Sequence, residues 1–434
     1  MRAYLNIVKS ILENGERKPN RTGVDALAVA GRMFEHDMSK GFPLLTTKKM
    51  PFKVVAVELE FFIKGLTDKN WLQERNNHIW DEWASPMKAP YDHTPEAKEK
   101  MKAERDLGPI YGFQWRHFNA QYQNYDKDYT GQGTLKINPD DRRMIVSAWN
   151  PSMIGEMALP PCHYAFQITV INGKLNLLWN QRSVDTMLGL PFNIASYAIL
   201  LHLLAKEAGL QEGKLVGFLA DTHIYVNHID GAKEQLSRDP NLYPLPKIET
   251  QNFTSIFNWK AEDTQLLTIL LMAVTVDGKI AKTTDHLANW TSKADKKIFV
   301  EETKKAGVIV MGETTYKTIG RPLPGRLNVI MSHTPDASQN QPGILEFTNT
   351  PPRELLRDLV DRGFNAVILG GGATINGLFL QEGLIDEVWL TIEPKIFGEG
   401  LSLFKGADVN LDLEMIETRQ LDANVIQVRY KVKK

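Results

Sequence analysis

Cysteine is almost absent from this chain, because Cys162 is the only one among 434 residues. A single cysteine excludes an internal disulfide. The thiol is therefore either an inert core residue, which is the usual fate of a free cysteine, or a nucleophile. Pro160 and Pro161 stiffen the chain before it, and His163 follows it. This context favours chemistry but does not settle it.

A surplus of either charge is also missing, since 51 Lys and Arg residues nearly balance 52 Asp and Glu residues. No global field then draws the chain to nucleic acid or to an anionic membrane, and any anionic ligand must be bound by local arginines. The longest apolar run, residues 266–274, is far shorter than the roughly 20 residues that cross a bilayer. The first ten residues do not resemble a signal peptide. We expect a cytoplasmic protein in a reducing setting, with no membrane, nucleic-acid or metal partner.

The domain organisation follows from length and from a change of pattern. At roughly 150 residues per domain the chain is long enough for two or three domains. Near residue 263 the pattern changes to alternating strands and helices, without a Gly/Ser linker. We therefore predict one domain over residues 1–263 and another over 264–434. The second is expected to be an open, mainly parallel α/β sheet with an antiparallel C-terminal edge.

The periodicity of apolar residues predicts the main elements. In the first domain it predicts helices over residues 2–14, 51–63, 193–208 and 226–236 and strands over 27–34, 143–149, 163–170, 174–180 and 215–219. In the second domain it predicts strands over 267–274, 308–311, 327–331, 366–369, 388–392, 413–417 and 425–432 and helices over 293–305, 353–362 and 373–380. Asn172-Gly173 is a strong hairpin signal. The charged stretch 84–106 is expected to be a solvated loop with a short helix.

Several polar groups accompany Cys162 in the first domain, namely Arg21, Arg142, Arg143, Gln181, Arg182, Ser183, Asp185, Asn193, Asp221, His223 and Tyr225. Each alone is usually structural; Asn193, for example, can simply cap the helix that it opens. Together, several guanidiniums and a hydroxyl form a phosphate site, and a cysteine near such positive charge has a depressed pKa. Glu58, between Val57 and Leu59, is either solvent-facing or partly buried, with its pKa raised.

Motifs in order along residues 1–262 resemble the thymidylate synthase family. They are RTG at Arg21, GFPLLTTKK at Gly41, WDEW at Trp80, GPIYGFQWR at Gly108, DRRMIVSAWNP at Asp141, LPPCHYAFQ at Leu159, QRSVD at Gln181, GLPFNIASYA at Gly189 and DTHIYVNH at Asp221. The resemblance implies a mixed sheet with helices, of α+β character, and an obligate homodimer. It implies that Arg21, Arg182 and Ser183 hold the phosphate of dUMP, while Arg142 and Arg143 reach the phosphate in the partner's site.

The same resemblance implies the reaction. Cys162 would add to C6 of the uracil, so that C5 attacks the methylene group of 5,10-methylenetetrahydrofolate. Asn193 would read the uracil edge, since an amide both donates and accepts. The roles implied for the other residues are the deoxyribose hydroxyl for His223 and Tyr225, proton steps for Glu58 and Tyr111, and the folate for Trp80 and Asp185.

One departure concerns the lid. In this family the chain ends in a tail that closes over the ligands, but here the synthase pattern runs through SIFNWKAED and continues into the next domain. Either another segment closes the site, or water captures the methylene intermediate and gives hydroxymethyl-dUMP. The second outcome would make the enzyme a dUMP hydroxymethylase.

In the second domain, the run of glycines from Gly370 to Gly372 between a strand and a helix can present amides to an anion, and Asp295 near a helix start can be a cap. The motif IGRPLPGR, its preceding MG, VILGGG and the interval from Trp290 to Asp295 resemble dihydrofolate reductase. The resemblance implies a doubly wound α/β domain in which Asp295 assists protonation while a nicotinamide delivers hydride. It places the folate at Phe299, Thr303, Arg326 and Thr391, and the cofactor at Gly312, Thr314, Ser332, Gly370, Gly371 and Gly372.

Two features keep alternatives open for this domain. VDGKIA and the strand pattern also resemble the pyrimidine reductases of riboflavin synthesis. Glu313 stands where many reductases place a base for the 2′-phosphate of NADPH, so NADH is an alternative to NADPH. The leading hypothesis is a bifunctional enzyme that makes dTMP and reduces the resulting dihydrofolate. The alternatives are a hydroxymethylase fused to a pyrimidine reductase or to a non-catalytic binding module.

Overall fold

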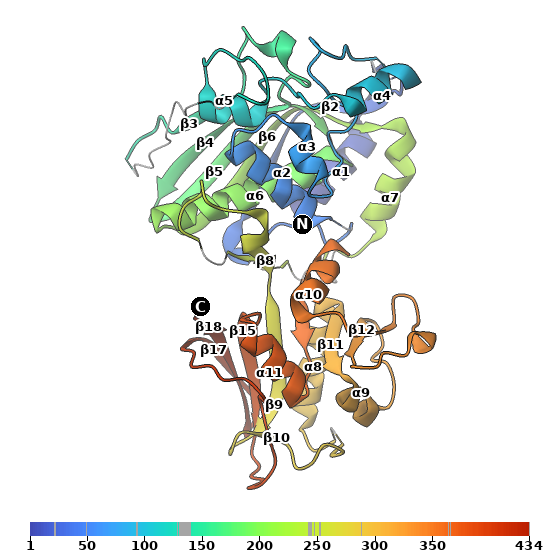
Figure 1. Cartoon of the computed structure of the whole chain (residues 1–434), viewed down its shortest axis with the longest axis vertical. Coiled ribbons are helices and arrows are strands. Elements are labelled where there is room, and N and C mark those ends of the chain that lie inside the picture. Colours follow the sequence, from blue (N-terminus) through green and yellow to red (C-terminus); the bar gives the residue numbers. More distant parts are fainter. Residues whose placement is uncertain are drawn as a thin grey trace. The chain divides into compact units, whose positions relative to one another are not determined.

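The computed structural model describes residues 1–20, 23–48, 50–92, 94–127, 129, 140–241, 245–246, 248–250, 253–287, 289–362, 364 and 366–433. The chain divides into two compact units (Figure 1). Unit 1 comprises Met1–Pro240 and Asn252–Thr264, and unit 2 comprises Asn241–Gln251 and Gln265–Lys434. Residues 241–251 thus group with unit 2 although both flanking segments belong to unit 1, which the sequence did not indicate.

Unit 1 is built on one mixed sheet. Its helices are α1 (Arg2–Asn14), η1 (Met38–Lys40), α2 (Phe52–Ile63), α3 (Lys69–Gln73), α4 (Pro95–Ala103), α5 (Tyr111–His117), η2 (Ile154–Glu156), α6 (Gly189–Ala208), η3 (Val226–His228), α7 (Ile229–Ser237) and η4 (Ala261–Asp263). Its strands are β1 (Glu16–Lys18), β2 (Ala26–Asp37), β3 (Ile145–Ser147), β4 (His163–Ile171), β5 (Lys174–Asp185) and β6 (Gln211–Tyr225). The sheet order is β1-β2-β6-β5-β4-β3.

The predicted hairpin joins β4 and β5. Asn172 and Gly173 both have positive φ, 52° and 73°, as a two-residue turn of this kind requires. β5 then pairs in parallel with β6, and the apolar helix α6, which connects them, packs on both strands (Figure 1). This crossover brings the carboxyl ends of β5 and β6 together, with Ser183 paired to Asp221 and Asp185 to His223.

Several sequence expectations in unit 1 were wrong in extent, and some short helices were not predicted; β5, for example, ends at Asp185 rather than at residue 180. Helix α6 begins at Gly189 rather than at Asn193, because Pro191 falls in the first turn, where a missing N–H costs nothing. Strand β6 extends to Tyr225, well beyond residue 219, because it pairs with β2 along its length. The seven-residue helix α5 was not predicted.

Unit 2 contains α8 (Lys293–Ala306), α9 (Glu313–Ile319), η5 (Ala337–Gln339), α10 (Pro352–Asp361) and α11 (Ala373–Gln381). Its strands are β7 (Ile248–Thr250), β9 (Thr268–Thr275), β10 (Lys279–Ala281), β11 (Val308–Gly312), β12 (Leu327–Met331), β13 (Leu345–Thr348), β14 (Val367–Leu369), β15 (Glu387–Glu393), β16 (Leu401–Ser402), β17 (Leu413–Asp422) and β18 (Val425–Val432); β8 (Thr264–Leu266) spans the division between the units.

The main sheet of unit 2 has the order β13-β12-β11-β14-β9-β15-β18-β17. In this sheet order, the strands from β13 through β12, β11, β14 and β9 to β15 pair in parallel, whereas β18 and β17 pair antiparallel. This confirms the predicted architecture. Successive residues of β11 enter opposite cores: Val308 and Val310 pack with α10 and α11, whereas Ile309 and Met311 pack with α8 and α9. The sheet is therefore covered on both faces. Within the described ranges, no helix combines the length and apolar character needed to cross a membrane.

Candidate active site

Cys162 lies immediately before β4 and is partly exposed. Its backbone N–H donates to the Tyr111 hydroxyl at 2.8 Å, and its carbonyl accepts from the backbone N–H of Arg182 at 2.8 Å. The β4–β5 register shifts between His163 and Ala165, an irregularity that re-aims side chains. The thiol is thus held between α5 and β5 at the end of the hairpin.

The Arg182 side chain is fixed beside this thiol. Its Nε donates to the Pro161 carbonyl at 3.0 Å and its Nη2 to the Pro160 carbonyl at 2.7 Å. Nη2 also lies 3.9 Å from Sγ of Cys162. The two prolines therefore supply acceptors that orient the guanidinium, and a positive charge adjoins the sulfur where it stabilises a thiolate.

The rings of Tyr111, His163 and Tyr197 form a cluster next to Cys162. The rings of Tyr111 and His163 stack with centroids 4.4 Å apart, and His163 Nδ1 is 3.0 Å from the Tyr197 hydroxyl. Burial lowers the pKa of His163 to about 3, so the imidazole is neutral near pH 7. Burial, followed by the neighbouring Cys162, raises the pKa of Tyr111. Both rings therefore stay uncharged while they support the thiol.

Glu58 on α2 is a carboxylate with a perturbed pKa. Burial raises its pKa to about 7, opposed by the hydrogen bond from Trp80; the indole Nε1 donates to Oε1 at 2.8 Å. Part of the residue still reaches the surface, but its carboxyl group accepts from Trp80, whose ring packs edge to face on Phe62 of α2 and Tyr111 of α5. Glu60, the other acid on this helix, accepts from the backbone N–H of Ala261 at 2.8 Å instead. The two acids of α2 therefore have different partners.

Asn193 lies within α6 and does not cap it. Its Oδ1 accepts from Gln181 Nε2 at 2.9 Å, and Gln181 Oε1 in turn accepts from the Trp179 indole at 3.1 Å. This chain of bonds fixes which end of the Asn193 amide carries the donor. Asp185 accepts from the backbone N–H groups of Met187 and Leu188, both at 3.0 Å, in the turn before α6.

The predicted sugar-binding pair lies at the end of β6. His223 Nδ1 is 3.0 Å from Oδ1 of Asp221, whose other oxygen pairs with Lys18 at 2.5 Å. The His223 and Tyr225 rings meet edge to face at 5.3 Å. Because Ser183 and Asp185 pair with the same stretch of β6, these predicted residues share one end of the sheet.

Within the described residues, the structure does not place the other predicted phosphate ligands with the residues around Cys162. Arg21 lies outside the described residues. Arg142 and Arg143 are exposed, and the Arg143 guanidinium pairs with Asp141 at 2.9 Å. Their predicted reach into a partner's site stays a prediction.

In unit 2, Asp295 lies in the first turn of α8. The cap of that helix is Ser292, whose hydroxyl accepts the Asp295 backbone N–H at 3.1 Å, so the Asp295 carboxyl group is not the cap. That carboxyl is buried, and burial raises its pKa, an effect that the nearby Thr391 and Thr291 hydroxyls oppose. A buried acid with a raised pKa can hold a proton for transfer.

The predicted folate residues Phe299 and Thr303 lie on α8. Arg326, directly before β12, contacts Thr303. Thr303 is fully buried, donates to the Phe299 carbonyl at 2.5 Å and accepts from Arg326. Arg326 also donates to the Pro324 carbonyl at 3.0 Å. The structure therefore brings these three residues together, and the Arg326 guanidinium binds the carbonyl of the turn that precedes it.

The predicted cofactor residues gather at the carboxyl ends of β11, β12 and β14, the edge where doubly wound sheets bind dinucleotides. The Gly312 N–H donates to the Gly371 carbonyl at 2.9 Å. A Cβ on Gly370 would come within 2.5 Å of Cδ1 of Ile309, so a side chain there would displace the end of that isoleucine. Ser332 donates to Glu313 at 2.5 Å, and Thr314 is exposed on α9. The Gly370 N–H donates to the Val310 carbonyl at 2.9 Å, so the predicted pyrophosphate site would rest on the amides of Gly371 and Gly372 before α11.

Sequence reasoning did not assign roles to several residues that support these sites: Trp149, His163, Gln181, Tyr197 and Asp221. Trp149 lies under the Arg182 guanidinium at 5.6 Å. Gln181 and Asp221 occur inside the quoted motifs QRSVD and DTHIYVNH, and His163 follows the cysteine directly, so the signal was present. Within the described residues, no cluster of three or more His, Cys, Asp or Glu is placed to hold a metal.

Unit 1 thus holds Cys162 beside the Arg182 guanidinium, and Asn193, His223 and Tyr225 lie on α6 and β6 of the same mixed sheet fold. Residues 2–268 match the family model described as thymidylate synthase, which covers more than half of the chain. The chain therefore belongs to the thymidylate synthase family, and the predicted fold of this part is confirmed.

Residues 267–427 match the model described as the RibD C-terminal domain, a fold similar to that of dihydrofolate reductase. Among curated relatives, the bifunctional dihydrofolate reductase-thymidylate synthase of Paramecium tetraurelia is 42% identical over 273 residues, which are 61% of this chain. The chain spans 58% of the length of that relative. The predicted fold of unit 2 is confirmed, while its reductase substrate stays a prediction.

Proposed function

We propose that the chain is a bifunctional enzyme that converts dUMP and 5,10-methylenetetrahydrofolate into dTMP and dihydrofolate, and then reduces dihydrofolate to tetrahydrofolate. The observation that carries the first activity is the arrangement of Cys162, Arg182 and Tyr111 within a chain of the thymidylate synthase family. The distance of 3.9 Å between Arg182 and the sulfur supports a nucleophilic thiolate.

In this proposal Cys162 adds to C6 of the uracil and C5 attacks the folate methylene group. Loss of the C5 proton and cleavage of the bond between the methylene carbon and N5 of the folate leave an exocyclic methylene group on the pyrimidine. Hydride from the tetrahydrofolate ring adds to that group, Cys162 leaves from C6, and the products are dTMP and dihydrofolate. Asn193 reads the uracil because its Oδ1, already bound by Gln181, has a second lone pair for N3–H, while its NH2 group donates to O4.

The remaining residues of unit 1 position substrate and protons. Arg21, Arg182 and Ser183 hold the phosphate, His223 and Tyr225 hold the deoxyribose hydroxyl, and Trp80 and Asp185 face the folate. Glu58, with a pKa of about 7, exchanges protons with the pyrimidine near neutral pH, with Tyr111 beside it. In a homodimer, the exposed Arg142 and Arg143 reach the partner's phosphate site.

Unit 2 carries the proposed reduction. When bound, a nicotinamide supplies hydride to the dihydropterin. Asp295 hydrogen-bonds the pterin and keeps a proton available, because burial raises its pKa. Phe299, Thr303 and Thr391 line the pterin site, and Arg326 pairs with the folate carboxylate after giving up part of its contact with Pro324.

Residues at the edge proposed to bind the dinucleotide bear on the choice between NADPH and NADH. Glu313 pairs with Lys317 at 2.7 Å and accepts from Ser332, so the position that meets the adenosine ribose carries a carboxylate and an ammonium together. NADPH is our default, and the Lys317 charge offers it a partner. The Glu313 charge favours a free ribose hydroxyl and keeps NADH as an alternative.

A second candidate for unit 2 is a pyrimidine reductase, and the specific observation that favours it is the match of residues 267–427 to the RibD C-terminal domain. The two candidates share hydride transfer but differ in the acceptor. Purified full-length protein with NADPH separates them: consumption with dihydrofolate supports the first, and consumption only with a pyrimidine intermediate of riboflavin synthesis supports the second.

The product of unit 1 is tested by mass spectrometry of nucleotides after incubation with dUMP and methylenetetrahydrofolate. Clean dTMP with an equal amount of dihydrofolate supports methylation. Hydroxymethyl-dUMP without dihydrofolate would instead identify a hydroxymethylase, in which water reaches the methylene intermediate before hydride does.

A further inference from the structure

A cavity of about 270 Å³ lies in unit 2 at the end of α8 remote from Asp295. It is lined by Lys305 and Ala306 of α8, by Trp389 of β15 and by Arg429 of β18. About three turns of helix, roughly 16 Å, separate Asp295 from Ala306. The lining of this α8 cavity shares no residue with the proposed pterin and dinucleotide sites, although Thr303 of the pterin site lies three residues before Ala306 on the same helix.

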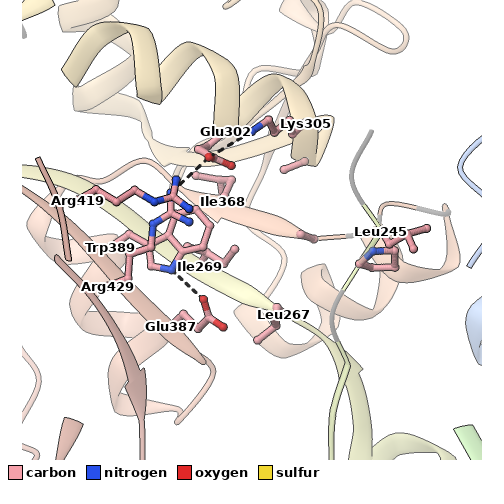
Figure 2. Close-up of a pocket in the computed structure, with 13 residues that line it drawn as sticks. Leu245, Leu267, Ile269, Glu302, Lys305, Ile368, Glu387, Trp389, Arg419 and Arg429 are labelled. Carbon is pink, nitrogen blue, oxygen red and sulfur yellow. Dashed lines mark hydrogen bonds and ion pairs between the residues drawn. The ribbon is translucent and has the colours of Figure 1, made fainter. Parts of the chain in front are cut away.

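One wall of the α8 cavity is apolar. Leu267, Ile269 and Ile368 come from the sheet, and Leu245 and Pro246 come from the segment 241–251. Figure 2 shows Leu245 across the view from the charged side chains. Flat apolar walls of this kind accept a ring. The volume is just below the roughly 300–1,000 Å³ of drug-sized sites, which suits one or two rings.

The opposite wall is a cluster of buried charges. The Arg429 side chain is 9% exposed and that of Glu302 is 11% exposed, with Nη2 and Oε1 3.3 Å apart. The Arg429 guanidinium lies 3.6 Å above the Trp389 ring, and the Trp389 indole donates to Glu387 at 2.8 Å. Burying such groups is costly, and a fold that needed only a core here would be cheaper with apolar residues.

The charges around the α8 cavity favour an anion. Three cations, Lys305, Arg419 and Arg429, line it against the two carboxylates Glu302 and Glu387. Figure 2 shows Arg419 and Arg429 gathered together. Burial, with Arg419 as the second cause, lowers the pKa of Arg429, so the two guanidiniums oppose each other. Glu417 lies 2.8 Å from Arg419 and 3.9 Å from Arg429, so an anionic ligand would take over part of a role that this partly exposed acid now fills.

We propose that the α8 cavity is a second ligand site, which binds a small carboxylate carried on a flat body of one or two rings. The ring packs between Ile269, Ile368 and Leu245. The carboxylate meets Arg419, whose side chain is 39% exposed and whose partner Glu417 is equally exposed, so this surface pair yields at little cost. Lys305, 43% exposed, adds a further donor at the mouth.

The test is calorimetric titration of the full-length protein, in the presence of dUMP and NADPH, with 2-naphthoate and with 2-naphthylmethylamine, which carries a positive charge on the same ring. We expect the carboxylate to bind and the amine to bind at least tenfold more weakly. Arg419→Gln should weaken 2-naphthoate about tenfold, and Ala306→Phe should abolish binding by filling the cavity. Arg353→Gln, an equal charge change on α10, should leave the affinity unchanged.

Three results would overturn the proposal: no binding of 2-naphthoate to the unmodified protein at millimolar concentration, equal affinity for the amine, or equal affinity in Arg419→Gln. Thermal unfolding checks the variants. If Ala306→Phe does not fold, the comparison of the two ligands and Arg419→Gln still decide the question.

Discussion

The Trp80 indole donates a 2.8 Å hydrogen bond to the Glu58 carboxylate. This bond stabilises the charged form and opposes the burial that raises the Glu58 pKa to about 7. Replacing Trp80 by Phe removes the donor, so the pKa of Glu58 should rise further. The inflection near pH 7 in the pH profile of kcat for dTMP formation should move to higher pH.

The matched control for that variant is Trp71→Phe, a change of the same type on α3. It should leave the inflection in place. An inflection that stays fixed or moves to lower pH in Trp80→Phe would contradict the assignment of the titrating group to Glu58.

Glu58 also makes stability depend on pH. Its pKa is raised from 4.5 when unfolded to about 7 when folded, so the native state binds more protons between these values. The free energy of unfolding therefore falls as pH rises across that window, by roughly 3 kcal/mol at most. Glu58→Gln should lack this fall, whereas Glu13→Gln on the surface of α1 should retain it. Denaturant unfolding at pH 5 and pH 8 measures the difference, and equal pH dependence in Glu58→Gln and the unmodified protein would count against it.

Arg182 should control the reactivity of the only cysteine. Arg182→Gln removes the guanidinium 3.9 Å from the sulfur, so less thiolate is present and alkylation of Cys162 by iodoacetamide at pH 7 should slow. Arg182→Lys should restore part of the rate, because the charge returns without the fork that binds Pro160 and Pro161. Mass spectrometry of the single labelled site follows the reaction.

An exposed arginine provides the control for that experiment. Arg75→Gln should alkylate at the unmodified rate. If Arg182→Gln reacts as fast as the unmodified protein, Arg182 does not stabilise the thiolate.

Replacing Asp295 should impair dihydrofolate reduction without impairing dTMP formation. Asp295→Asn keeps the shape of the buried site but removes the exchangeable proton, so dihydrofolate reduction should fall by about 10²-fold or more while dTMP formation continues. Because burial raises the Asp295 pKa, reduction in the unmodified protein should fall as pH rises through that value. Asp336→Asn, at the cap of the exposed η5, should change neither rate. Unimpaired reduction in Asp295→Asn would exclude the proposed role.

Local chemistry made much of the fold predictable. Asn172-Gly173 fixed a hairpin because few residues tolerate positive φ in succession, and the apolar runs of β11 and β12 indicated a buried parallel sheet. The end of β6 was not predictable because pairing with β2 decides it, whereas the start of α6 could have been read from Pro191. The grouping of residues 241–251 with unit 2 involves Glu249 and Lys431, 3.0 Å apart in space but remote in sequence.

The candidate site was likewise predictable from the sequence only in part. The identity of Cys162 and its companions followed from motif order, but the partner of Glu58 did not, since Trp80 is on a separate segment with no periodic relation to α2. For Asp295, sequence position favoured capping, and only the Ser292 bond to its N–H shows that the carboxyl group is available for another role.

The most direct test of the proposed pair of activities is the ratio of NADPH oxidised to dTMP formed by the full-length protein, supplied with dUMP and methylenetetrahydrofolate. We predict one NADPH consumed per dTMP, with dihydrofolate accumulating only when NADPH is omitted. Formation of dTMP with dihydrofolate accumulating undiminished, while neither NADPH nor NADH is consumed, would contradict it.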